Sequence, residues 1–217
     1  MNVIRTVRTG AALFLTASIV YLASETIAAG AWTQPAYRYA FNNISDLGVR
    51  IDTIVDGRLI HSPLHAVMNA GFALQGLLFL LAHLFILSLF PAAFKVPGAL
   101  LAFAHGIGMV LVAAFHGVHY EALDPHVIGA GMAIVGGNAA LMLTAAALRS
   151  RTPASFLPTV SIALGGLGIA AVVLMVLHPF GYPAVFERIS VYAITLGQAL
   201  AAVRLLRISL FFRSVSG

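Results

Sequence analysis

Residues 63–90 read PLHAVMNAGFALQGLLFLLAHLFILSLF, a stretch without a single Asp, Glu, Lys or Arg. A helix rises about 1.5 Å per residue, so about 20 apolar residues cross the roughly 30 Å hydrocarbon core of a bilayer. This stretch is long enough to do so with residues to spare. We therefore interpret it as a transmembrane helix.

Working outward from this stretch, five further apolar runs meet the same criterion: 9–31, 97–115, 126–148, 157–178 and 184–206. Segments of alternating polarity, which are typical of barrel strands, are not visible. Because the backbone of a membrane span must satisfy its own hydrogen bonds, the runs favour helices. The sequence predicts an all-α, polytopic membrane protein, a six-helix transmembrane bundle. Residues 1–217 then form one integral membrane domain with a long loop at 32–62.

The composition agrees with this class. Charged residues make up 9% of the chain and hydrophobic residues 60%, whereas an average soluble domain is roughly 25% charged. These values exclude a cytosolic enzyme, a nucleic-acid binder and a disordered tail. The absence of cysteine excludes disulfides, thiolate metal sites, Fe–S clusters and a Cys nucleophile. Nothing in the sequence indicates a nucleotide or haem site, and the oligomeric state stays open.

The first run has a second interpretation. Arg5, Arg8, an apolar stretch and the small residues Ala29-Gly30-Ala31 also resemble a signal peptide, although the run is long for a signal-peptide core of 7–15 residues. Cleavage there would leave five spans, with every later orientation unchanged.

The positive-inside rule orients the bundle. With the amino terminus inside, eight Lys and Arg residues fall on the inner side, namely Arg5, Arg8, Lys95, Arg149, Arg151, Arg204, Arg207 and Arg213. Four fall outside, namely Arg38, Arg50, Arg58 and Arg188. We therefore expect both termini in the cytoplasm of a bacterium and the chain in its plasma (inner) membrane. Membrane lipid is then the expected surrounding partner.

Acidic residues and histidines gather on the opposite, extracytoplasmic side in this topology. All seven carboxylates and six of the eight histidines lie there. Long loops need polar residues, which explains part of the asymmetry. It does not explain Glu25, which lies within the first span, where an ionisable group is expected to pair or to face a polar cavity. Glu187 and Arg188, at the mouth of the sixth span, form a mutual pair, partner other groups, or act as an interfacial cap.

Several outer histidines have the chemistry of metal ligands. His61 and His65 are four residues apart, and they would share one face if the second helix began before Pro63. His65 and His126 begin inward-running spans, and His116 and His119 lie in the loop between the third and fourth spans. Three neutral imidazoles with an open position are a common catalytic zinc arrangement. We therefore expect zinc or another divalent metal at His65, His116, His119 and His126, with Asn69 supporting His65. Histidines that only bond carbonyls are the alternative.

The long loop contains the string Asn43-Ile44-Ser45-Asp46-Leu47-Gly48. Asn, Ser and Asp in series cap a short helix or turn. Beside histidines, Ser45 and Asp46 could also supply a hydroxyl and a base or ligand. The apolar residues of this string suit docking, so we expect the loop to fold back over the helix ends and to bring Asp46 near His65 or the His116/His119 pair.

The string belongs to a wider pattern. Glu25, Trp32, Tyr37-x-Tyr39, the I-S-D-L-G string, Ser62-Pro63-Leu64-His65, Gly136-Gly137-Asn138 and Glu187-Arg188-x-Ser190-Val191-Tyr192 resemble the bacterial membrane proteins grouped as domain of unknown function 998. The resemblance covers nearly the whole chain. It implies a six-helix integral membrane protein, in agreement with the independent span count, and it implies no particular reaction.

Two functions from different classes fit these residues. The first is a metal-assisted hydrolase or transferase on a lipid or lipid-linked substrate, with Glu25, Ser45, Asp46, Glu187 and Arg188 as catalytic candidates. The second is a non-catalytic membrane protein that binds a lipid or a partner. A small transporter is less well supported, because the spans lack midplane charges and broken helices.

Overall fold

A computed structural model describes residues 3–50, 53–55, 58–116, 124–149, 156–177 and 181–215. Its six long helices are α1 (Val3–Ala31), α2 (His65–Ile86), α3 (Ala92–Ala114), α4 (Pro125–Ala147), α5 (Leu157–Leu177) and α6 (Pro183–Val215). Each is long and apolar enough to cross a membrane, which confirms the predicted six-helix transmembrane bundle. A 3-10 helix, η1 (Ser45–Gly48), lies in the long loop, and another, η2 (Leu87–Leu89), follows α2.

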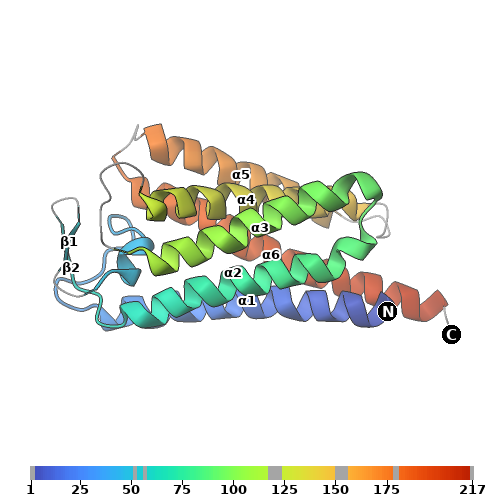
Figure 1. Cartoon of the computed structure of the whole chain (residues 1–217), viewed down its shortest axis with the longest axis horizontal. Coiled ribbons are helices and arrows are strands. Elements are labelled where there is room, and N and C mark those ends of the chain that lie inside the picture. The colour runs from blue at the N-terminus through green and yellow to red at the C-terminus, as the bar shows by residue number, and fades with distance from the viewer. Residues whose placement is uncertain are drawn as a thin grey trace.

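The six helices lie lengthwise beside one another (Figure 1), and their contacts close a ring of α1, α2, α3, α4 and α6 with α5 outside it. α1 packs on α2 and α6, α3 packs on α2 and α4, and α4 contacts α6, while α5 lies against α4 and α6. Both described ends of the chain lie at one end of the bundle, which we call the terminal end. The segment between α1 and α2 lies at the opposite end, which we call the loop end.

Several helix boundaries differ from the predicted runs. Pro97, the expected start of the third span, lies inside α3, which begins at Ala92 with Pro91 as its N-cap. Position 97 is the sixth of the helix, so the missing N–H of proline leaves the Ala93 carbonyl without its intrahelical hydrogen bond. α2 begins at His65, so His61 is not on this helix, and the condition for a shared face of His61 and His65, a helix that begins before Pro63, is not met. α6 continues beyond the predicted end to Val215.

The described part of the loop also contains a hairpin that the sequence reasoning missed. Strand β1 (Thr53–Val55) pairs antiparallel with β2 (Arg58–Ile60). Asp56-Gly57 separates the strands in the sequence, and Asp-Gly between apolar residues is a hairpin signal that could have found them. Three-residue strands are too short to show a clear period-two pattern.

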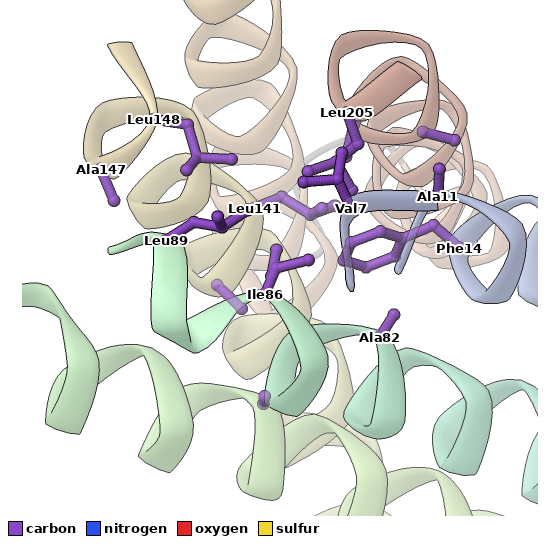
Figure 2. Packing of buried hydrophobic residues seen from close by; sticks show 14 of the residues in the cluster. Val7, Ala11, Phe14, Ala82, Ile86, Leu89, Leu141, Ala147, Leu148 and Leu205 are labelled. Carbon is purple, nitrogen blue, oxygen red and sulfur yellow. The ribbon is translucent and has the colours of Figure 1, made fainter. Parts of the chain in front are cut away.

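Buried apolar residues fill the bundle at the terminal end. Val7, Ala11 and Phe14 of α1 meet Ala82 and Ile86 of α2, and further contributions come from Leu141, Ala147, Leu148 and Leu205 (Figure 2). A second buried cluster at the loop end includes Tyr21, Trp32, Ile44, Leu47 and Phe72. The loop between α1 and α2 therefore contributes to the core instead of lying free.

Candidate functional site

Residues 42–49, which we call the lid, cover the loop end of the bundle. Ile44, Leu47 and Val49 are 1%, 0% and 4% exposed, and η1 packs on α1 and α2. Burial of these three apolar side chains offsets the entropy cost of ordering a long loop. This confirms the expectation that the I-S-D-L-G string docks onto the helix ends.

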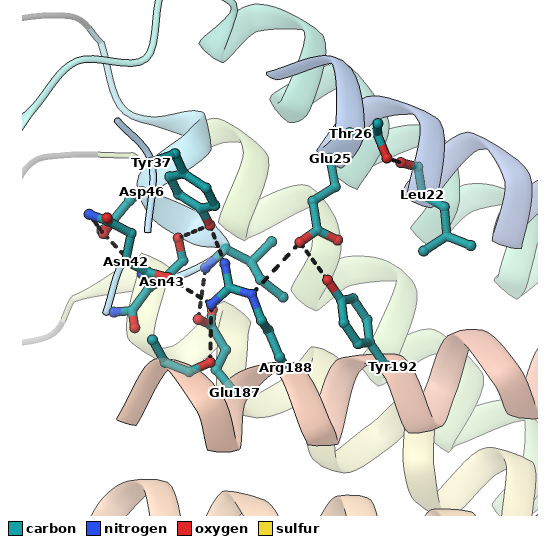
Figure 3. Close-up of polar contacts among 12 residues, drawn as sticks. Leu22, Glu25, Thr26, Tyr37, Asn42, Asn43, Asp46, Glu187, Arg188 and Tyr192 are labelled. Atoms are coloured by element: carbon teal, nitrogen blue, oxygen red, sulfur yellow. Dashed lines mark hydrogen bonds and ion pairs between the residues drawn. The ribbon is translucent and has the colours of Figure 1, made fainter. Parts of the chain in front are cut away.

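Two adjacent residues of α6 hold the lid from one side (Figure 3). The Glu187 carboxylate accepts a hydrogen bond from the Ile44 amide at 2.8 Å. Arg188 donates to the Asn42 carbonyl at 2.7 Å and to the Tyr37 hydroxyl. The planar guanidinium carries five donors in a fixed arrangement, so one side chain can engage several acceptors at once.

Helix α2 holds the lid from the other side. Ser62, just before the helix, donates to the Leu47 carbonyl at 2.7 Å, and Asn69 donates to the Gly48 carbonyl at 2.8 Å. A Cβ at position 48 would lie 2.3 Å from the Asn69 side-chain oxygen, so a larger residue there would displace the Asn69 side chain that binds the Gly48 carbonyl. Asn69 therefore supports the lid, and its predicted support of His65 stays a prediction.

Glu25 faces polar groups. Its carboxylate accepts a hydrogen bond from the Tyr192 hydroxyl at 2.8 Å, and the Arg188 Nε lies 3.9 Å away. Glu25 is 3% exposed, so pairing is what makes a carboxylate tolerable at this depth. The expectation that Glu25 has a polar partner is confirmed, and the partners are Tyr192 and Arg188 of α6.

Asp46 contacts its own loop. Its carboxylate accepts from the Asn43 amide at 3.0 Å and from the Asn42 side chain at 3.4 Å. A side chain reaching back three residues to a free amide is one half of a capping box. These contacts support the capping interpretation, and the proximity of Asp46 to the histidines stays a prediction.

Tyr37 joins the lid to Arg188. Its hydroxyl donates to the Asn43 carbonyl at 2.9 Å. Burial raises the pKa of Tyr37 above its ordinary value, although the nearby Arg188 charge opposes this. The hydroxyl consequently stays protonated across the physiological range and keeps its donor role.

Three of the four predicted metal ligands are described, and each is anchored through Nδ1 to a backbone carbonyl: His65 to Ser62, His116 to Ala113 and His126 to Phe115. The rings of His65 and His116 have centroids 6.3 Å apart. His119 lies outside the described residues. Within the part of the chain that the structure describes, no group of three His, Asp or Glu residues is placed to hold one metal ion.

A cavity of about 40 Å³ lies beneath the lid. Five helices line it, through Tyr21 of α1, Phe72 of α2, Val112 of α3, Ala130 of α4 and Val191 of α6. Its polar wall residues Ser45, His126 and Glu187 come from the lid and from the ends of α4 and α6 at the loop end. We call this the upper cavity. The cavity brings Ser45, Glu187 and His126 together, whereas Glu25, Asp46 and Arg188 do not line it.

Neither the cavity nor the role of Tyr192 and Tyr37 followed from the sequence reasoning. The tyrosines stood in the quoted pattern, but their partners are distant in the chain. Glu25 and Tyr192, for example, are 167 residues apart. The signal that could have indicated this contact is that Glu25 and Tyr192 are both polar residues near the predicted outer ends of their spans.

Comparison with known proteins gives a family. The family model described as "Protein of unknown function (DUF998)" matches residues 14–204. No curated protein and no solved structure matches the chain.

Proposed function

The chain belongs to the DUF998 family of proteins of unknown function, and from that premise we propose that it binds an amphiphile, a lipid or lipid-linked molecule, in the upper cavity. The single observation that supports this proposal most is the composition of the cavity walls. Apolar side chains of five helices surround a space whose polar residues, Ser45, His126 and Glu187, lie near the loop end. An amphiphile fits such a site with its head group at the polar end and its apolar part among the helices.

The packed core below the cavity favours the binding of an amphiphile over the transport of a solute through the bundle. Phe14, Phe79, Ile86, Leu141 and Leu205 pack together in the terminal half of the described bundle. A close-packed core of this kind leaves no path for a solute without rearrangement. We therefore favour a binding protein over a transporter.

We propose that the loop end faces outward from a bacterial plasma membrane. The excess of eight Lys and Arg residues over four, counted in the predicted topology, favours cytoplasmic termini. The amphiphile would then come from the outer leaflet, and the lid would form the extracytoplasmic cover of the site.

One observation favours a second function, the metal-assisted hydrolase or transferase. His65 and His116 lie close, and each has its Nδ1 bound to a backbone carbonyl, which orients Nε2 as in many zinc sites. Zinc or another divalent metal there, with His126 or His119 completing the set, would activate water beside the amphiphile's head group. Glu187 and Ser45, which line the cavity together with His126, would be the candidates for a base and a hydroxyl.

Photolabelling tests the binding proposal. The protein is reconstituted in nanodiscs that contain phosphatidylethanolamine with a diazirine on its acyl chain, and labelled peptides are mapped by mass spectrometry. We expect labelling on the cavity segments of α3, α4 and α6. Ala130→Leu narrows the cavity and should reduce this labelling several-fold.

The matched control is Gly131→Leu, on the same helix. A Cβ at Gly131 meets no heavy atom within 4 Å, so this variant adds the same side chain outside the cavity and should label normally. Equal labelling of the two variants would contradict the proposal. Metal analysis of the purified protein tests the second function: one zinc per chain, lost in His65→Ala and His116→Ala, would support it.

A further inference from the structure

A second cavity of about 20 Å³, which we call the lower cavity, continues the upper one toward the middle of the bundle. The two share five wall residues: Tyr21, Met109, Ala133, Ile134 and Val191. The lower cavity differs in its polar wall residues, which are Gln75, His105 and Thr195. We refer to these three as the polar floor.

We propose that the polar floor recognises an oxygen function, a hydroxyl or a carbonyl, on the apolar chain of the bound amphiphile. This inference rests on the proposed function and names its ligand class: a chain with polar groups at two levels. A purely apolar chain would leave buried amide and hydroxyl groups facing hydrocarbon, and an oxygen at this level would satisfy them.

The hydrogen bonds of the floor leave capacity unused. The two ring nitrogens of His105 face oxygens: Nδ1 lies 2.7 Å from the Ala133 carbonyl and Nε2 lies 3.1 Å from Gln75 Oε1. Gln75 also contacts the Gln198 side chain at 3.4 Å. A carboxamide offers two N–H donors and two oxygen lone pairs, so these two contacts use only half of its capacity.

Two neighbouring groups add to this capacity. The Thr195 hydroxyl donates to the Val191 carbonyl at 3.1 Å, which leaves its oxygen able to accept. Gln198 is 0% exposed, and its Nε2 has no hydrogen-bond partner among the described residues. Buried polar groups are ordinarily paired, and a ligand oxygen would use the remaining hydrogen-bond capacity of Gln75 and Thr195.

The spacing of the two polar levels sets the length of the chain between them. Glu187 and Thr195 are eight residues apart on α6. On α4, His126 is seven residues from Ala133, whose carbonyl contacts the floor residue His105. At about 1.5 Å of rise per residue, the levels are roughly 10–12 Å apart. An extended chain advances about 1.2 Å per bond, as the peptide backbone does, so about nine bonds separate the two oxygen functions.

This length defines a matched pair of probes. 1,8-octanediol has two oxygens joined by a chain of nine bonds, and 1-octanol lacks only the second oxygen. Each alcohol is titrated as a competitor of the diazirine phosphatidylethanolamine label in nanodiscs, and the ratio of their half-maximal concentrations is recorded for each protein variant. Because the partition of the alcohols into lipid is the same for every variant, it cancels when the ratios are compared.

We expect Gln75→Leu to raise the half-maximal concentration of the diol about tenfold relative to that of 1-octanol, because the second hydroxyl then meets an apolar floor. Thr195→Val, which keeps the side-chain shape, should shift it in the same direction by several-fold. Thermal unfolding of each variant checks folding, and Thr195→Val keeps the test valid if Gln75→Leu does not fold. An identical ratio in the unaltered protein and in the folded variants would overturn the inference.

The failure of this inference is distinguishable from that of the proposed function. If neither alcohol competes but Ala130→Leu still reduces labelling, the amphiphile site stands and the polar floor has no recognition role. If Ala130→Leu labels like Gly131→Leu, the amphiphile site itself is wrong.

Discussion

At the scale of single residues, Arg188 connects three parts of the molecule. It contacts the lid at Asn42, the hydroxyl of Tyr37 and the carboxylate of Glu25 on α1. The rings of Tyr37 and Tyr39 also lie within 5.5 and 5.1 Å of its guanidinium carbon, which suits a cation–π contact. Arg188 is 7% exposed, so the loss of its contacts is not compensated by water.

We therefore expect Arg188→Lys to loosen the lid although it keeps the charge. A lysine is a point donor and cannot reach the same acceptors together, so the variant should lose about 2 kcal/mol of stability, the scale of one hydrogen bond to a charged group. The only tryptophan of the chain, Trp32, is buried beside Tyr37 with a ring distance of 5.2 Å. Its fluorescence should shift to the red in the variant.

The matched control for this prediction is Arg38→Lys. Arg38 is an exposed residue of the same loop whose guanidinium lies 3.9 Å above the Phe41 ring. Arg38→Lys should leave both the melting temperature and the Trp32 emission almost unchanged. Unchanged emission in Arg188→Lys would show that Arg188 does not hold the lid.

Asp46 gives a second prediction at this scale. If the Asp46 carboxylate caps its own turn, the free energy of unfolding of Asp46→Asn should lie within about 0.5 kcal/mol of that of the unaltered protein, because asparagine caps nearly as well. Asp46→Ala should lose about 1 kcal/mol, because the Asn43 amide then has no acceptor. Thermal unfolding in detergent measures both.

A different pattern would favour a chemical role for Asp46. That pattern is an Asp46→Asn variant with normal melting that has lost its bound zinc or its lipid labelling. The sequence indicated Glu25, Asp46, Glu187 and Arg188 as candidates, and each of them makes polar contacts in the structure. The partners could not be predicted, because Glu25, Tyr37 and Arg188 meet only after helices far apart in the chain have packed.

At the scale of elements, apolar length predicted the helices and local chemistry set their ends. α1 begins at Val3 and includes Arg5 and Arg8, which an apolar criterion excludes although charged residues are accepted near a membrane interface. α4 begins as expected, with Pro125 at its first position and Asp124 accepting from the His126 amide at 2.8 Å. The hairpin was missed because its strands are too short to show periodicity.

Glycines separate into those that hold helices together and those that do not. A Cβ at Gly108 would lie 2.5 Å from both the Ala133 nitrogen and the Gly129 oxygen, so α3 and α4 approach backbone to backbone. A Cβ at Gly129, Gly136, Gly137, Gly165 or Gly168 would likewise lie within 3.0 Å of a neighbouring heavy atom. A Cβ at Gly131 or Gly166, in contrast, would meet nothing within 4 Å.

Gly108→Ala should consequently destabilise the bundle. The added methyl group has only backbone atoms to displace, and overpacking of this kind costs about 1–3 kcal/mol. Gly131→Ala is the control and should be neutral or slightly stabilising, since alanine favours the helix. Thermal unfolding of both variants in one detergent compares them, and equal melting temperatures would refute the close approach of α3 and α4.

At the scale of the whole molecule, the ring of helices creates the upper cavity, which no single segment of the chain forms alone. The walls of the upper cavity come from five helices and the lid, and its boundary toward the terminal end is the packed core. Sequence periodicity indicates which residues are apolar, but it does not give the helix order around the ring. The cavity therefore became visible only with the packed bundle.

The side of the membrane that the cavity faces is the last prediction. The chain ends lie at one end of the bundle (Figure 1), so the two ends share a side whichever way the bundle is inserted. The direction of insertion follows from the positive-inside rule, because the predicted topology places eight Lys and Arg residues on the side of the termini and four on the opposite side. Green fluorescent protein fused after Arg151 or at the carboxyl terminus should fluoresce, and alkaline phosphatase inserted at Asp56 should be active.

The reverse pattern would mean that the whole bundle is inserted in the opposite direction. Phosphatase activity at Arg151, with none at Asp56, would place the lid in the cytoplasm and make the inner leaflet the source of the amphiphile. The cavity, the lid and the polar floor would be unchanged by this, because they depend on packing alone. Fusions that disagree with each other, with Arg151 and the carboxyl terminus on opposite sides, would instead contradict the six-span bundle itself.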